Sequence, residues 1–319
     1  MSPTELEVER SVRDLLYGDR VEVAAKPLSR PSAVGDTALG GLVGARYRLV
    51  QRIGAGGMAT VYQARDERLK RDVAVKIIAD RLANVPSAVR RFRREAELGA
   101  RMEHPNVVAI LDAGAEPQEF IVMELVEGLD GGRLVERDGR LMPALAVHVV
   151  AQVCRALEHA HDRHVFHNDV SARNIVISER DATATLVDFG IASDSHDVRT
   201  TRPKDLLGTP GYVPPEILKG GRPSPRSDLY ALGVVAHRFL AGPTTPPPSV
   251  TGDTTPLATA APRLQLLAEL RPGLPRRLSA AVDQALSIDP DARQRSVAEF
   301  RAHLVGGRIA RPVELARTA

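Results

Sequence analysis

The sequence contains a single cysteine, Cys154, and no tryptophan in its 319 residues. One cysteine cannot build an internal disulfide framework, which favours a reducing compartment. No window holds 18 or more consecutive apolar residues, the length that indicates a membrane-spanning helix, and residues 1–20 carry many charges. The sequence therefore predicts neither a membrane span nor a secretory signal, and we expect a cytoplasmic protein.

The formal net charge is also small, at +3, so the composition gives no reason to expect nucleic-acid binding. With 43% hydrophobic and 26% charged residues, the chain is long enough for one large domain or two lobes around a core. Lysine is scarce, and it occurs only at Lys26, Lys70, Lys76, Lys204 and Lys219. Because the other basic residues are all arginines, a lysine inside an apolar strand stands out.

A polar loop between two apolar runs, residues 165–177, contains Asp169 and Asn174. A later apolar run ends in Asp188, which Phe189 and Gly190 follow. This order predicts strand, loop, strand, turn and strand, with three oxygen-bearing side chains in one small volume. One carboxylate can take a proton from a hydroxyl group, and the amide and the second carboxylate can hold a hard cation such as Mg²⁺. We expect Asp169 to act as the base, with Asn174 and Asp188 as metal ligands.

A glycine-rich segment follows a predicted strand over residues 47–53, and two further predicted strands cover residues 59–64 and 72–78. This arrangement is an antiparallel meander, whereas a dinucleotide-binding fold would begin a helix directly after its glycines. The glycines therefore predict a loop whose backbone N–H groups fold over phosphates. Ala59 stands at the third small position of this loop, where its methyl group allows close phosphate approach at mild cost.

Lys76 lies in the apolar strand Val-Ala-Val-Lys. Burying an unpaired ammonium group is very costly, so Lys76 needs an anionic partner, and the α- and β-phosphates of ATP can supply it. A carboxylate on the following helix would hold the lysine in place. Glu95, nineteen positions later, is the candidate, and Glu97 is the alternative.

These motifs resemble those of protein kinases. The loop from His167 to Asn174 is similar to the kinase catalytic loop, and Asp188 begins the Asp-Phe-Gly motif. Residues 208–216, Gly-Thr-Pro-Gly-Tyr-Val-Pro-Pro-Glu, resemble the segment that closes the activation loop of serine/threonine kinases. The resemblance pairs Glu216 with Arg293 of the later Asp-Pro-Asp-Ala-Arg motif. The combination is similar to bacterial eukaryotic-like serine/threonine kinases.

The resemblance implies an α+β, bilobal protein kinase fold over residues 46–305. The expected N-lobe, residues 46–126, has a five-stranded sheet and one main helix near residues 87–102. The expected C-lobe, residues 127–305, is larger and helical, with a Pro/Thr-rich insertion at 242–262. Residues 1–45 are expected to form a flexible N-terminal extension, and residues 306–319 a C-terminal tail.

The resemblance also implies a protein kinase that transfers the γ-phosphate of ATP to Ser/Thr hydroxyls of protein substrates, with Mg²⁺ or alternatively Mn²⁺. The sequence does not identify a regulatory partner. Lys76 and Glu95 would position the phosphates. The expected nucleotide-binding residues are Ile53, Gly54, Ala55, Gly56, Gly57, Met58, Ala59, Thr60, Val61, Ala74, Lys76, Met123, Glu124 and Val126.

Two positions depart from the family pattern. Asn168 replaces an arginine that normally pairs with a phosphorylated activation-loop residue, and an amide cannot supply that bidentate cation. We therefore predict activity that does not depend on phosphorylation of Thr200 or Thr201. Ser171 replaces a lysine that steadies the γ-phosphate, and we predict that Arg173 takes over this role. This feature resembles tyrosine kinases, while the Gly-Thr-Pro-Gly-Tyr segment favours Ser/Thr.

Two other functions are compatible with parts of the pattern. A pseudokinase, acting as a nucleotide-binding or scaffolding module, fits the altered Asn168 and Ser171, although such proteins usually lose the lysine, the base or a metal ligand. A small-molecule kinase of the aminoglycoside or choline phosphotransferase type shares the spacing from His167 to Asn174. Such enzymes usually lack the Asp-Phe-Gly and Pro-Pro-Glu segments that this sequence contains.

Overall fold

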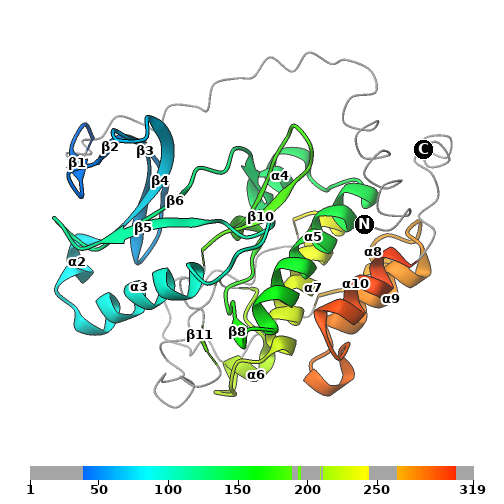
Figure 1. Cartoon of the computed structure of the whole chain (residues 1–319). Coiled ribbons are helices and arrows are strands. Elements are labelled where there is room, and N and C mark those ends of the chain that lie inside the picture. The colour runs from blue at the N-terminus through cyan, green and yellow to red at the C-terminus, as the bar shows by residue number, and fades with distance from the viewer. Residues whose placement is uncertain (1–38, 189–192, 195–208, 210, 244–263, 307–319) are drawn as a thin grey trace, which may run out of the picture. The chain divides into compact units, whose positions relative to one another are not determined.

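The computed structural model of the chain describes residues 39–188, 193–194, 209, 211–243 and 264–306 (Figure 1). These residues form two compact units. The first contains the described residues up to Glu103 together with Val108–Val126. The second contains His104–Val107 and the described residues from Glu127 onward. Most of the predicted insertion and tail, as well as Thr200 and Thr201, lies outside the described residues.

The first unit is built on an antiparallel sheet of six strands in the order β1-β2-β3-β4-β6-β5. The strands are β1 (Leu42–Val43), β2 (Tyr47–Ala55), β3 (Ala59–Asp66), β4 (Arg71–Ile78), β5 (Ile110–Gly114) and β6 (Phe120–Glu124). The sequence predicted five strands, because β1 is too short to show a period and was assigned to the N-terminal extension. The strand predicted from Val107 begins instead at Ile110, since Val107 forms an isolated bridge with Leu186.

One face of this sheet is covered by helix α3 (Pro86–Gly99), which follows the single-turn helix α2 (Asp80–Ala83). The sequence predicted α3 but not α2, because one turn of helix leaves no period to detect. Phe92 of α3 is fully buried and packs in one cluster with Ala59, Ile78 and Ile121 of the sheet. This packing fixes α3 against strands β3, β4 and β6.

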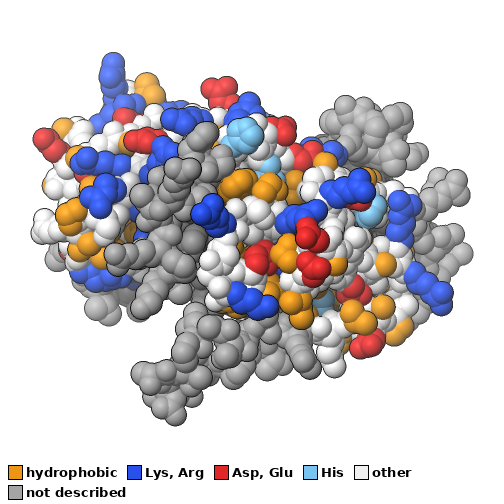
Figure 2. Space-filling view, turned by 90° about the horizontal axis from the view of Figure 1, so that it is seen from below, with side chains coloured by type: hydrophobic (Ala, Val, Ile, Leu, Met, Phe, Trp, Pro, Cys, Tyr) orange, Lys and Arg blue, Asp and Glu red, His pale blue; other side chains and the backbone are white. Residues whose placement is uncertain are grey.

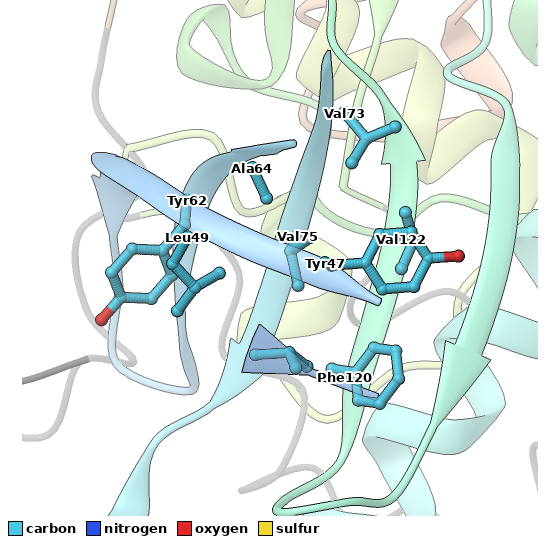
Figure 3. Packing of buried hydrophobic residues seen from close by; sticks show 9 residues of the cluster. Tyr47, Leu49, Tyr62, Ala64, Val73, Val75, Phe120 and Val122 are labelled. Atoms are coloured by element: carbon cyan, nitrogen blue, oxygen red, sulfur yellow. The ribbon is translucent and has the colours of Figure 1, made fainter. Parts of the chain in front are cut away.

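The opposite face of the sheet carries a second apolar cluster (Figure 3). It contains Val43, Tyr47, Leu49, Tyr62, Ala64, Val73, Val75, Phe120 and Val122. Side chains alternate between the two faces of a strand. Because Val73 and Val75 face this cluster, Ala74 and Lys76 of the same strand lie on the face that α3 covers.

The second unit is mainly helical. Its helices are α4 (Gly131–Asp138), α5 (Pro143–His161), α6 (Pro215–Leu218), α7 (Pro225–Ala241), α8 (Leu267–Leu270), α9 (Arg276–Ala285) and α10 (Val297–Val305). Helix α7 begins with a capping box between Ser224 and Ser227, and almost all of its residues are buried. Helices α5 and α10 pack around α7, and α9 contacts both α7 and α10 (Figure 1).

Short strands in this unit position the polar loop between residues 166 and 175. The strands are β7 (Leu129–Asp130), β8 (Val165–Phe166), β9 (Ile175–Ile177), β10 (Ala184–Leu186) and β11 (Ser193–Asp194). Strand β9 pairs with β10 and β7, while β8 pairs with β11. The loop therefore begins at the end of β8 and ends, through the 3₁₀ turn Ala172–Asn174, at the start of β9.

The surface mixes charges of both signs. Figure 2 shows basic and acidic side chains interspersed over the visible face, with no large area of one sign, which agrees with the small net charge. Within the described parts of the chain, we find no helix with the length and apolar character that crossing a membrane requires.

Candidate active site

The Asp169 carboxylate is held by hydrogen bonds on both of its oxygens. Its Oδ1 accepts from the backbone N–H and from Oγ1 of Thr209, both at 2.7 Å. Its Oδ2 accepts from Nδ2 of Asn174 at 3.1 Å, and the same amide donates to the Asp169 carbonyl at 2.8 Å. These bonds fix the carboxylate in one orientation while leaving it partly accessible.

The backbone of the loop is anchored on Asp228, a buried residue of α7. Its carboxylate accepts from the backbone N–H groups of His167 at 2.9 Å and Asn168 at 2.8 Å, and contacts His161 Nε2 at 2.8 Å. Burial opposes ionisation, but the bond to His161 and the other nearby donors hold the pKa of Asp228 below its ordinary value. Helix α7 therefore carries a buried charge that fixes the loop.

Two replacements in the loop have local structural consequences. Asn168 has a positive φ of 63°, a region that Asn occupies more readily than most residues. Ser171 is fully buried, and its Oγ has no hydrogen-bond partner among the described residues. A buried hydroxyl at position 171 cannot reach out to a phosphate as a lysine would. His167, which is also buried, accepts the Asp169 N–H at 3.2 Å through Nδ1, so it supports the loop.

The predicted metal ligands lie on neighbouring backbone segments. The Val187 N–H donates to the Asn174 carbonyl at 2.8 Å, which brings Asp188 beside Asn174. Asp188 has a positive φ of 66°. Phe189 and Gly190 lie outside the described residues, so the remainder of the predicted Asp-Phe-Gly motif is not placed.

Arg173, predicted to replace the missing lysine, is turned toward α4. Its Nη2 lies 3.0 Å from Oε1 of Glu136, and the two side chains are 66% and 61% exposed. Its stem runs along the first turn of α4, where a Cβ on Gly132 would lie 2.9 Å from Arg173 Cγ. Among the described residues, Glu136 is the one ion-pair partner of this arginine.

In the first unit, Lys76 of β4 forms a buried ion pair with Glu95 of α3. Its Nζ lies 2.6 Å from Glu95 Oε1, and the side chains are only 7% and 6% exposed. The alternative partner, Glu97, is 59% exposed and pairs with Arg94 at 3.2 Å. The sheet explains the choice, because Lys76 lies on the face covered by α3 and Glu95 is on the buried side of that helix.

The glycine-rich loop joins β2 to β3. The Gly56 N–H donates to the Ala59 carbonyl at 2.9 Å, and Met58 O accepts from Ala79 N–H at 2.9 Å. A Cβ on Gly57 would meet no atom within 4 Å, so the space beside this glycine is open. Hydrogen bonds thus fix the loop backbone before and after Gly57, and the space beside Gly57 is empty.

Residues 47–295 match the family model described as protein kinase domain. The chain belongs to the protein kinase family. The first unit is the small, sheet-based lobe of the bilobal α+β kinase fold, and the second unit is the larger helical lobe.

Several bacterial serine/threonine kinases are similar to this kinase chain. Serine/threonine-protein kinase PknB of Mycolicibacterium smegmatis is 39% identical over 275 residues, covering 82% of this chain and 42% of PknB. PrkC of Bacillus subtilis is 38% identical over 205 residues, covering 64% of this chain and 32% of PrkC. The kinase chain therefore spans less than half the length of these curated relatives.

A solved structure with the same fold is the PknI kinase domain of Mycobacterium tuberculosis, as a double mutant. It superposes with a TM-score of 0.66 at 28% identity, and the match covers 84% of this chain and 99% of the PknI chain. Protein kinases use ATP with a divalent metal ion.

The side chains fit these groups. Val61, Ala74 and Lys76 occupy one face of the sheet, and Met123 pairs with Ala74 in register. This face, with the open loop, suits a nucleotide. Ile53, Gly54 and Ala55 end β2, and Thr60 lies near the start of β3. The Glu124 side chain accepts from Ala109 N–H, and Val126 follows β6.

The predicted metal ligands, Asn174 and Asp188, carry oxygen atoms of the kind that a divalent ion such as Mg²⁺ prefers. No group of three or more His, Cys, Asp or Glu side chains that could hold a metal occurs in the described ranges. A kinase metal site needs fewer protein ligands, because Mg²⁺ is commonly held by one or two carboxylates together with phosphate oxygens and water. Nδ2 of Asn174 donates to Asp169, and this bond does not use the amide oxygen Oδ1, which is the atom that could bind a metal ion.

The helical lobe of the kinase contains the predicted pair of Glu216 and Arg293. Two guanidinium nitrogens of Arg293 contact the two Glu216 oxygens, each at 2.8 Å. Arg293 is fully buried and also donates to two carbonyl groups at 2.8 Å. Sequence reasoning missed Thr209, Asp228 and Glu136 as partners of the loop. Thr209 lies in the segment 208–216 that resembles the end of the activation loop, whereas nothing local marked Glu136.

Proposed function

We propose that the chain is a serine/threonine protein kinase that transfers the γ-phosphate of Mg-ATP to hydroxyl groups of protein substrates. The proposed kinase domain covers residues 46–305, with the lobes divided after residue 126. The observation that carries the proposal is the Asp169 carboxylate, which Thr209 and Asn174 orient from two sides. The serine/threonine kinases among the relatives support the same assignment.

In this proposal, Asp169 is the base. Its carboxylate receives the hydroxyl proton of the substrate while its hydrogen bonds keep it oriented. Asn174 and Asp188 hold Mg²⁺, for which Mn²⁺ is the alternative. Bound Mg-ATP supplies the phosphoryl group and the cation that neutralises its charge. Lys76, positioned by Glu95, pairs with the α- and β-phosphates.

Arg173 is the proposed substitute for the lysine that Ser171 replaces. Its ion pair with Glu136 is exposed on both sides. Exposed pairs of this kind contribute only about 0–1 kcal/mol, so releasing the arginine costs little. The proposed nucleotide-binding residues are the loop residues 53–61 together with Ala74, Lys76, Met123, Glu124 and Val126.

The Gly-Thr-Pro-Gly-Tyr segment and the names of the relatives favour serine and threonine as acceptors. Thr209 of this segment is the residue that bonds Asp169. A cytoplasmic location is also proposed, because the only cysteine, Cys154, is a buried free thiol, which suits a reducing compartment.

The test is transfer of labelled phosphate from ATP to a generic substrate such as myelin basic protein, with Mg²⁺ or Mn²⁺. Asp169→Ala is expected to lower kcat by a factor of about 10²–10⁴. Asp181→Ala, which removes a carboxylate from the turn between β9 and β10, is the matched control and should keep full activity. Phosphoamino-acid analysis should find label on Ser and Thr. ATP binding without transfer under all conditions would contradict the proposal.

A further inference from the structure

Glu136 and Gly132 form one continuous surface for the Arg173 side chain. The two residues are four positions apart on α4 and therefore lie on the same face of the helix. The Arg173 stem crosses α4 at Gly132, where a Cβ would lie 2.9 Å from Cγ and 3.7 Å from Nε. Its guanidinium group then reaches Glu136 at 3.0 Å.

This position holds the Arg173 side chain against α4 and not against Asp169. The hydrogen bonds to the Asp169 side chain come from Thr209 and Asn174, and none of those observed comes from Arg173. Arg173 directly precedes Asn174 in the loop, and its side chain is 66% exposed, so its rotamers can change without disturbing the core. The structure thus shows an arginine of the catalytic loop that is held against α4 by Glu136.

The ion pair between Arg173 and Glu136 is weak enough for another cation to take the place of Arg173. Both partners are more than half exposed, and pairs of this kind change an equilibrium by a factor of about five at most. A neighbouring pair, Arg137 with Glu179, has almost the same exposure but does not involve the catalytic loop. Any cation that competes for Glu136 will therefore release Arg173, while competition for Glu179 will not.

We propose that Glu136 restrains Arg173, and that a positively charged side chain of the substrate binds Glu136 and frees Arg173 for the transferred phosphate. This inference rests on the proposed function, in which Arg173 substitutes for the missing lysine. It makes Glu136 a positioning residue. The predicted substrate class is a protein segment with Arg or Lys near the acceptor hydroxyl, because a cation competes directly with the Arg173 guanidinium for the Glu136 carboxylate.

The first test uses two peptides that differ by one Arg or Ala near the acceptor serine. The wild type should prefer the Arg peptide by a factor of about two to five in kcat/KM. Glu136→Gln should raise kcat for the Ala peptide by a similar factor and abolish the preference. Glu179→Gln is the matched control and should leave both values unchanged. A preference for Arg that survives Glu136→Gln would overturn the proposal, as would the absence of any preference.

A second measurement does not require phosphate transfer. The Nε–H resonance of Arg173, identified by its loss in Arg173→Lys, should shift when the Arg peptide is added but not when the Ala peptide is added. Glu136→Gln should show the shifted position without peptide. Gly132→Ala should move the resonance in the same direction, because its methyl group displaces the arginine stem. No shift at saturating Arg peptide refutes the exchange even if the chain proves inactive, whereas a shift without transfer refutes only the proposed function.

Discussion

Replacing Lys76 by methionine should separate two roles of the buried ion pair. Lys76→Met removes the cation and leaves the Glu95 carboxylate on the buried side of α3 without its lysine. Replacing both residues, as in Lys76→Met with Glu95→Leu, removes both charges of the pair together. We expect the single variant to lose activity and stability, and the double variant to lose activity alone.

The expected loss in the free energy of unfolding follows from the burial of the Lys76–Glu95 pair, whose side chains are 7% and 6% exposed. Breaking a buried pair by removing one partner costs about 3–5 kcal/mol. A carboxylate left without its cation can take up a proton and become neutral. For a carboxylate of ordinary pKa, this protonation costs about 3.7 kcal/mol at pH 7, which sets an upper limit on the loss of stability. Lys76→Met should therefore cost about 3–4 kcal/mol. The double variant should lie within about 1 kcal/mol of the wild type or be more stable.

The assay is urea unfolding followed by far-UV circular dichroism, since the chain has no tryptophan. Amide hydrogen exchange in β4 and α3 then assigns the loss to the first unit. Lys70→Met is the matched control, because Lys70 is 68% exposed and pairs with Glu67 on the surface. Its expected cost is about 0–1 kcal/mol.

Equal stability of Lys76→Met and Lys70→Met would contradict this expectation, because the buried Glu95 carboxylate would then tolerate the loss of the lysine. The expectation also fails if the double variant is less stable than Lys76→Met. Such a result would mean that Glu95 stabilises the helix through something other than the lysine. Full kinase activity in the double variant would contradict the proposed role of the pair in positioning phosphates.

Three further outcomes are expected. Arg293→Met should lower the free energy of unfolding by about 3–5 kcal/mol in urea, because it leaves Glu216 without its buried bidentate partner. The pKa of Asp228 is lowered in the folded chain, so its stabilisation is present above the ordinary value near 3.9 and is lost as pH falls further. In Asp228→Asn, the unfolding free energy should therefore decrease less between pH 6 and pH 3 than it does in the wild type. Replacing Thr200 and Thr201 by alanine should leave phosphate transfer intact in the labelled-ATP assay.

Each of these three predictions has a result that would contradict it. Arg137→Met breaks exposed pairs and should cost about 0–1 kcal/mol, so an equal cost for Arg293→Met would contradict the effect of burial. An unchanged pH dependence in Asp228→Asn would show that other carboxylates cause the acid instability. Loss of transfer in the double threonine variant would show that Asn168 does not remove the need for activation-loop phosphorylation.

Several features of the fold and of the candidate site were predictable because they depend on residues close together in the sequence. Lys76 stands out among apolar residues, and the alternation of strand side chains places it on one face. The spacing of Asp169 and Asn174 within one loop predicted their proximity, and the structure shows a direct hydrogen bond. The choice of Glu95 over Glu97 came from the resemblance, and the register of α3 against the sheet gives the physical reason for it.

Other features were not predictable because they depend on contacts between distant parts of the chain. Strand β1 is two residues long and forms only because β2 offers it a free edge. The helix α4 begins with two glycines, which weaken any helical signal, and Asp130 caps it. Strand β1 is too short to show a period, and the two glycines at the start of α4 weaken its helical signal.

The sequence by itself determined which residue types the proposed chemistry has available: a proposed base, two proposed metal ligands, and a lysine with its glutamate. Only the tertiary structure decided how they are held. Thr209 reaches Asp169 across 40 positions, Asp228 reaches His167 across 61, and Arg173 turns to Glu136 across 37. Local patterns show which face of an element is buried, but a hydrogen bond between distant residues exists only once helices and loops have packed together.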